Sequence, residues 1–226
     1  MSETFAKDTS GRSKKDWILA LSVLLFGLIV AHLGVSMFLT AALGTDTFTV
    51  FIQGLSLSFQ KMTGTSFPSV GTVHVAVLCL VMAVMFFTTK GYIKPGTVIC
   101  AFCGGPIIDF FNWLITPFCN EASPMYIRMP VMLLGCIVLS LGMSIVINSQ
   151  AGTGPNDLIA IVISDKLQRI QFRFVRMGCD IFFVIIGFIL GGVVGVGTIA
   201  AAFLTGPLVQ FWLPKTKSLI QKLPYR

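Results

Sequence analysis

One pattern of glycine, proline and small hydroxyl residues occurs twice along this chain, and it limits the possible folds more than any other feature. Its first part is Leu33-Gly34-Val35-Ser36 with Gly44-Thr45, which returns as Leu141-Gly142-Met143-Ser144 with Gly152-Thr153. Its second part is Gly96-Thr97, Phe102, Gly105-Pro106 and Phe110, which returns as Gly197-Thr198, Phe203, Gly206-Pro207 and Phe211. Residues of these types set backbone bends and close helix contacts. The sequence therefore predicts two copies of one structural unit.

The composition places both copies in a lipid bilayer. Of 226 residues, 55% are hydrophobic and 11% are charged, whereas soluble domains carry about 25% charged residues. The runs long enough to cross about 30 Å of hydrocarbon are residues 17–39, 69–88, 96–116, 130–148, 175–190 and 197–213. Two shorter apolar runs, 47–60 and 156–167, contain polar residues and are expected to form short helices at the interface or dipping into it. We expect an all-α polytopic membrane protein with about six transmembrane helices plus two short helices.

The boundaries that follow are a basic cytoplasmic tail at residues 1–16, a first membrane repeat at 17–118, a second at 129–214 and a basic cytoplasmic tail at 215–226. Each repeat contributes an odd number of crossings, so the second must enter the membrane upside down relative to the first. The sequence thus predicts two inverted three-helix repeats, an arrangement that many transporters use.

Basic residues indicate the orientation of the chain. With six crossings and a cytoplasmic N-terminus, only Lys61 and Arg128 among the basic residues lie outside, as the bias toward cytoplasmic Lys and Arg requires. If the two short runs also crossed, Lys90 and Lys94 would lie outside, and Lys61 and Arg128 would lie inside. The number of basic residues outside would then be the same in both topologies. The short length of the run 47–60 decides for six crossings. We expect a multi-pass protein with both termini in the cytoplasm.

Several other functions find no support. The net charge of +7 falls at membrane ends, where orientation and contact with anionic lipid explain it, so the lipid bilayer and no nucleic acid is the expected partner. Most cysteines lie in apolar runs, which argues against a disulfide framework, and the Cys100–Cys103 spacing lacks the second ligand pair of a metal site. No hydrolase, zinc-peptidase or nucleotide-binding motif is present, so we expect neither an enzyme nor a cofactor.

Two loops, residues 44–47 and 152–157, each join a long predicted span to a short helix. Their polar residues, candidates for binding a solute, are Thr45, Asp46, Thr153, Asn156 and Asp157. One interpretation is plain helix capping, because these residue types satisfy the free N–H groups of a helix start. The other is that two broken-helix N-termini from inverted copies point toward a polar solute near the bilayer midplane.

The third span of each repeat contains a matched interruption and a matched polar residue. The interruptions are Gly105-Pro106 and Gly206-Pro207, where proline removes a backbone hydrogen bond and allows a kink. They indicate a transport path or a packing contact through glycine. Asp109 and Gln210 follow at equivalent positions, and we expect them to line a central polar cavity as solute-binding residues. A structural hydrogen-bonding role for Asp109 is the alternative.

Other ionisable residues lie on apolar segments. Arg176 and Asp180 are one helical turn apart and can form an ion pair, although Arg176 is also placed to act as an anchor at the membrane surface. His32 and His74 each lie on an apolar helix without a second ligand, so hydrogen-bonded interior histidines are expected rather than metal ligands.

These residues together resemble the YczE/YyaS/YitT family of bacterial integral membrane proteins. The resemblance spans about residues 17–214 and rests on four motifs. In the first half the motif is Leu43-Gly44-Thr45-Asp46 continuing to Val50-Phe51-Ile52-Gln53-Gly54-Leu55. In the second half the motifs are Gly152-Thr153-Gly154-Pro155-Asn156-Asp157, then Val175-Arg176 with Asp180, and then Gly192-Val193-Val194-Gly195-Val196-Gly197-Thr198 leading to Gly206-Pro207-Leu208-Val209. It implies a bacterial cytoplasmic (inner) membrane location and names no substrate.

The function that the sequence favours is a permease or exporter of a small solute. A bundle of this size leaves little room around a pore, which favours a homodimer. The alternative is a non-transporting membrane scaffold or regulator of another membrane process. A transporter should have a polar cavity lined by both repeats, whereas a scaffold should pack that interface dry.

Overall fold

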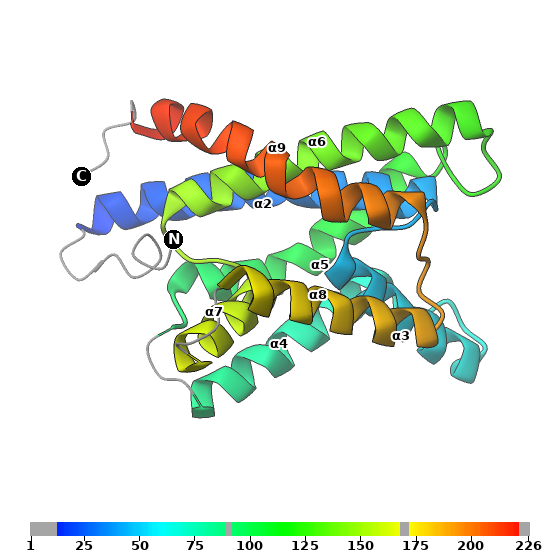
Figure 1. The fold of residues 1–226 in the computed structure, drawn as a ribbon, viewed down its shortest axis with the longest axis horizontal. Coiled ribbons are helices and arrows are strands. Elements are labelled where there is room, and N and C mark those ends of the chain that lie inside the picture. Colours follow the sequence, from blue (N-terminus) through cyan, green and yellow to red (C-terminus); the bar gives the residue numbers. More distant parts are fainter. Residues whose placement is uncertain (1–12, 89–91, 168–171, 222–226) are drawn as a thin grey trace.

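The computed structural model describes residues 13–88, 92–167 and 172–221, and within these every regular element is a helix (Figure 1). In chain order the helices are α2 (Lys14–Ala41), α3 (Thr47–Thr63), α4 (Val70–Thr88), α5 (Pro95–Ile115), α6 (Met125–Ser149), α7 (Pro155–Leu167), α8 (Phe172–Ile189) and α9 (Val196–Gln221). The protein is therefore an all-α polytopic membrane protein. Lys90, used above to judge orientation, lies outside the described residues.

Among the described helices, α2, α4, α5, α6 and α9 are long and apolar enough to cross a bilayer. The remaining predicted span corresponds to α8, whose 18 residues include Arg173, Arg176 and Asp180, and this charge keeps it out of the apolar group. Its exposed large side chains are nevertheless apolar: Phe174, Met177, Ile181, Phe182, Ile185, Phe188 and Ile189. Helix α8 therefore exposes an apolar face, as a helix in contact with lipid does. Helices α3 and α7 are the two short helices that the sequence predicted.

One boundary differs from the sequence interpretation. Helix α9 continues through Pro214 to Gln221, so residues 215–221 are helical rather than part of a separate tail. Asn148 of α6 supports this turn, because its side-chain amide donates to Leu213 O at 2.9 Å and to Thr216 Oγ1 at 2.7 Å. Contacts from a neighbouring helix thus hold α9 together around the proline.

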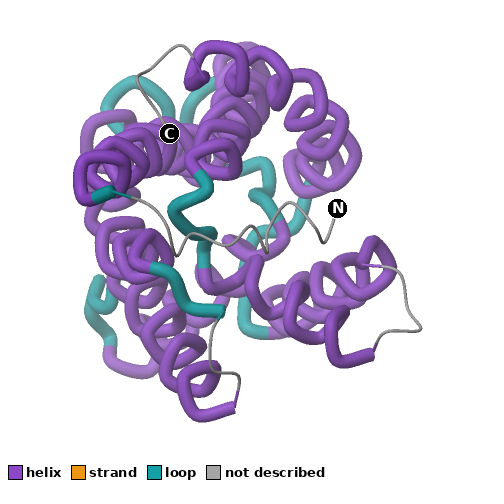
Figure 2. Tube along the Cα trace, turned by 90° about the vertical axis from the view of Figure 1, so that its left-hand side faces the viewer, coloured by secondary structure: helices purple, strands orange, loops and turns teal. Residues whose placement is uncertain are grey.

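The helices form two layers (Figures 1 and 2). Helices α2, α6 and α9 pack together in one layer, and α3, α4, α7 and α8 in the other, with α5 packed against both α2 and α4. Loop segments lie in the middle of the bundle when it is viewed end-on (Figure 2). Helices α3 and α7 lie toward opposite ends of the second layer, and α8 runs between them.

Helices α2 and α6 pack antiparallel along a glycine seam. A Cβ on Gly34 would lie 2.8 Å from Leu139 Cα, and one on Gly142 would lie 2.5 Å from Ala31 Cα. Gly142 matches Gly34 in the repeated pattern, and Leu139 stands two residues before Leu141 as Ala31 stands two before Leu33. The contact of Gly34 in α2 with Leu139 in α6 is therefore matched by the contact of Gly142 in α6 with Ala31 in α2. Only glycine permits so close an approach of the two backbones.

The loops that follow α2 and α6 are alike in backbone shape and in what they bind. Each helix ends in a left-handed residue, Ala42 at φ 50° and Gln150 at φ 53°, followed by a glycine of positive φ. Gly197 N at the start of α9 donates to Leu43 O at 2.7 Å, and Gly96 N at the start of α5 donates to Ala151 O at 3.1 Å. Each loop therefore binds a helix start from the other half of the chain.

Candidate functional site

Two helix starts meet at one turn of α8. Thr47, the first residue of α3, donates from Oγ1 to Asp180 Oδ1 at 2.7 Å. Asp157, in the first turn of α7, accepts from Arg176 Nη1 at 2.6 Å. Arg176 Nε in turn lies 3.5 Å from Asp180 Oδ2. We call Asp46, Thr47, Asn156, Asp157, Arg176 and Asp180 the Arg176 cluster; its members come from α3, α7 and α8, or from the residues at their N-terminal ends.

The start of α3 lies deep in the bundle. The ring of Phe48 lies 5.7 Å from that of His74, which lies 5.4 Å from His32, near the middle of α2. The chain therefore leaves the end of α2, folds back inward through residues 42–46, and begins α3 level with the interior of a spanning helix. A helix start in that environment needs partners for its free N–H groups. Asp46 supplies one, accepting from Thr49 N at 3.2 Å.

The charges of the Arg176 cluster do not balance. Three carboxylates, those of Asp46, Asp157 and Asp180, gather near one guanidinium. The side chains of Arg176, Asp157 and Asp180 are 33%, 27% and 31% exposed. The cluster is thus an acidic, partly accessible group in an otherwise apolar bundle.

Oxygen atoms without hydrogen-bond partners also gather around these two loops. Within the described residues, five buried side-chain nitrogen or oxygen atoms lack a partner, and three of them are Asp46 Oδ2, Thr97 Oγ1 and Thr153 Oγ1. Thr97 is fully buried and Thr153 is 7% exposed. Thr97 lies at the loop before α7, because a Cβ on Gly152 would lie 3.0 Å from its Oγ1. Buried polar atoms are nearly always hydrogen-bonded, so such a group of orphans points to a missing ligand or water.

The loop residues named from the sequence therefore lie around one cluster. Thr45 is buried and donates from Oγ1 to Asp46 O at 3.2 Å. Asn156 donates from Nδ2 to Asp157 Oδ1 at 3.2 Å. Sequence reasoning missed the shorter partner of Arg176, which is Asp157 rather than Asp180, because the two lie on different helices.

Asp109 and Gln210, by contrast, are not brought together. Asp109 binds the start of α4, where its carboxylate accepts from Ser69 Oγ at 2.5 Å and from Gly71 N at 3.0 Å. Gln210 is exposed on α9, which packs against α6. The cavity expected between these two residues is therefore not found in the described structure. The reason is that α5 packs on α4, whereas the equivalent α9 makes few contacts with α8.

The two glycine-proline pairs also differ in their surroundings. A Cβ on Gly105 would meet Gly71 O and would lie 2.5 Å from Val75 Cγ2, so this glycine lets α4 approach α5. Gly206 faces open space, with no atom within 4 Å of its Cβ position. Pro106 and Pro207 each lie inside a single described helix. Gly105 therefore serves close packing.

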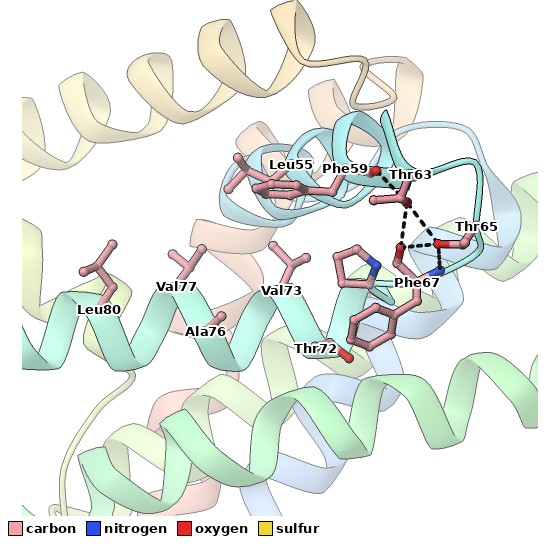
Figure 3. Close-up of a pocket in the computed structure, with 11 residues that line it drawn as sticks. Leu55, Phe59, Thr63, Thr65, Phe67, Thr72, Val73, Ala76, Val77 and Leu80 are labelled. Carbon is pink, nitrogen blue, oxygen red and sulfur yellow. Dashed lines mark hydrogen bonds between the residues drawn. The ribbon is translucent and has the colours of Figure 1, made fainter. Parts of the chain in front are cut away.

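Two cavities lie outside the Arg176 cluster. The larger, about 460 Å³, is an apolar groove between α3 and α4, with Leu55 and Phe59 on one side and Val73 and Val77 on the other (Figure 3). Its end is closed by the loop at Phe67, whose carbonyl accepts from Thr65 Oγ1 at 2.9 Å. The second, about 410 Å³, lies between α4 and α5 beside Asp109 and Pro106. Neither of these cavities reaches the cluster.

Comparison with known proteins gives the same class of molecule. The profile of a family of unknown function, DUF6198, matches residues 18–214. An uncharacterized protein of Haemophilus influenzae is 28% identical over 205 residues, which is 91% of this chain and 86% of the relative. The uncharacterized membrane protein YczE of Bacillus subtilis is 26% identical over 92% of this chain and 91% of its own length.

A second protein of B. subtilis, the uncharacterized protein YyaS, is 26% identical over 83% of this chain and 89% of its own length. No solved structure matches the chain. The family profile covers nearly all of the helical bundle, from the first turns of α2 to Pro214 in α9. This chain is therefore a membrane protein that belongs to the family of unknown function DUF6198 and is similar to YczE and YyaS.

Proposed function

We propose that this protein is a permease or exporter of a small solute, and that the Arg176 cluster is its solute site. The observation that carries the proposal is the meeting of two helix starts and three carboxylates around Arg176 inside an apolar bundle. Ionisable residues inside membranes are costly and mark solute or ion pathways. Helices that begin inside the bilayer form such sites in secondary transporters.

The protein on this proposal consists of two inverted copies of one unit in a bacterial cytoplasmic membrane, with both termini in the cytoplasm. The exchanged glycine contacts of α2 and α6 support the inverted relation, as do the matched loops that bind across the two halves. Single cysteines placed at the exposed Ser13 and Glu121 in a cysteine-free background test the orientation. We expect labelling of residue 121 from the periplasmic side and of residue 13 from the cytoplasmic side only. Cytoplasmic labelling at 121 would instead match a chain in which α3 also crosses.

The chemistry of the cluster favours a solute that carries a positive charge or N–H donors. The unsatisfied atoms are carboxylate and hydroxyl oxygens, and the carboxylates outnumber the one guanidinium near them. The positive ends of the α3 and α7 helix dipoles are already met by Asp46 and Asp157. A small organic cation would complete the hydrogen bonds that the protein leaves open.

Uptake into proteoliposomes tests the function and the site together. The probes are radiolabelled methylammonium, ethanolamine and guanidinium, which share a small cationic group. We expect saturable uptake by the wild-type protein and at least a tenfold loss in Asp157→Asn, because the amide cannot hold Arg176 in place. The matched control is Asp109→Asn, the same change at a carboxylate that binds the start of α4. It should retain uptake.

Each other outcome has a defined meaning. Wild-type liposomes that take up the probes no faster than protein-free liposomes would favour the alternative, a membrane scaffold or regulator. Uptake that is lost equally in Asp109→Asn and Asp157→Asn would move the solute site to the groove beside α5. Size-exclusion profiles of both variants in detergent, matched to the wild type, establish that each is folded.

A further inference from the structure

The two histidines of the chain face one another in the bundle interior, away from the Arg176 cluster. His32 lies on α2 and His74 on α4, with ring centroids 5.4 Å apart and ring planes at 79°. They are 9% and 7% exposed. His32 is hydrogen-bonded in the interior, as the sequence predicted, and α2 and α4 bring it beside His74, which the sequence did not indicate.

Gly104 of α5 lies against both rings. A Cβ on Gly104 would lie 2.8 Å from His32 Nε2 and 3.0 Å from His74 Nε2. Two atoms that are each within 3.0 Å of one point cannot be more than twice that distance apart. The two Nε2 atoms therefore lie close together beside Gly104, and a side chain at position 104 would press on both of them.

The hydrogen bonds of the pair indicate which atoms are free to bind. His32 Nδ1 lies 2.8 Å from Leu28 O, so Nδ1 of the neutral ring carries the proton and the lone pair is on Nε2. With its proton on Nδ1, the neutral ring of His74 would present its Nε2 lone pair beside that of His32.

We propose that His32 and His74 bind one soft monovalent metal ion, of the Cu(I) and Ag(I) class, between their Nε2 atoms. Across the described ranges, no third His, Cys, Asp or Glu groups with them as a metal ligand. Zinc takes four ligands, whereas Cu(I) and Ag(I) are stable with two in line. The ligands are neutral and Phe48 covers His74, so an ion of low charge is favoured over a divalent one.

The site is present once per chain. Ser140 stands in α6 where His32 stands in α2, and its hydroxyl donates to Cys136 O at 2.7 Å, one turn back, as His32 does to Leu28. The second half of the chain therefore keeps the local hydrogen bond without the metal-binding nitrogen. We expect a stoichiometry of one ion per chain.

Silver titration followed by NMR of the ring nitrogens tests the proposal directly. The protein is labelled with ¹⁵N-histidine and purified without a histidine tag, so only His32 and His74 give signals. Ag(I), a stable substitute for Cu(I), is added to the protein in detergent after its six cysteines are replaced by alanine. We expect both Nε2 resonances to move together and to saturate at one equivalent. Movement of one resonance alone, or of neither after one equivalent is bound, would overturn the proposal.

A variant that keeps both histidines separates the site from the fold. Gly104→Ala should weaken silver binding at least tenfold, because its methyl group would press on both Nε2 atoms. Gly206→Ala, the same change where the Cβ meets nothing, should bind silver as the parent does. Equal binding by the two variants would place the ion elsewhere. If Gly104→Ala does not fold, the titration of the parent protein still decides the question.

Discussion

Replacing Arg176 with alanine should destabilise the protein by on the order of 2 kcal/mol, less than the loss seen for a fully buried pair because the side chains are about one third exposed. The change leaves Asp157 and Asp180 facing each other without a cation. Arg176→Lys should fall between, because a single ammonium cannot hold two carboxylates as a planar guanidinium does. Thermal unfolding in detergent measures the differences.

Double-mutant cycles then rank the two partners of Arg176. The coupling of Arg176→Ala with Asp157→Asn should exceed that with Asp180→Asn, because the first pair is separated by 2.6 Å and the second by 3.5 Å. Additive effects in both cycles would mean that the cluster does not act as a unit. The reverse order would mean that the local pair on α8 dominates.

Gly142→Ala should have the largest effect of any single-methyl addition in the seam. The new Cβ would lie 2.5 Å from Ala31 Cα and closer still to Ala31 N, and both are backbone atoms that cannot turn aside. Overpacking of this kind costs about 1–3 kcal/mol, occasionally more. Gly34→Ala should cost a similar amount, because its Cβ would meet Leu139 in the counterpart contact.

The matched controls are Gly178→Ala and Gly206→Ala, in helices α8 and α9, where no atom lies within 4 Å of the Cβ position. Alanine is favoured over glycine in a helix interior by roughly 0.5–1 kcal/mol, so both controls should leave stability unchanged or raise it. Melting temperatures in one detergent compare all four variants. Equal losses at positions 142 and 206 would contradict the close-contact argument.

The fold could be predicted further from the sequence than the site could. Apolar runs located α2, α4, α5, α6 and α9, since length and composition alone decide whether a segment can span a bilayer. Helix α8 was located too, but its charged residues could not be interpreted without the partner that α7 provides. The length of α9 was underestimated because the apolar run ends at residue 213, whereas α6 supports the helix beyond Pro214.

Local signals indicated the helix starts, whereas long-range contacts could not be predicted. The residues at the two loops were identifiable because glycine, threonine and aspartate mark helix starts wherever they occur. The pairing of Asp109 with Gln210 was inferred from equivalent positions, but equivalent residues need not have equivalent neighbours, and α4 packs on α5 more closely than α8 packs on α9. The approach of His32 to His74 joins α2 and α4, and nothing in either segment alone indicates it.

The contacts along the α2–α6 seam are those of an isologous interface, in which one surface patch meets a second copy of itself. A half-length chain with the glycine surface of α2 would therefore be able to form a homodimer through that surface. The two copies would have to insert into the bilayer in opposite orientations. Joining two such chains end to end fixes one of each orientation. It also frees the two halves to diverge, so that one half can carry a histidine at the position where the other carries a serine without altering the seam.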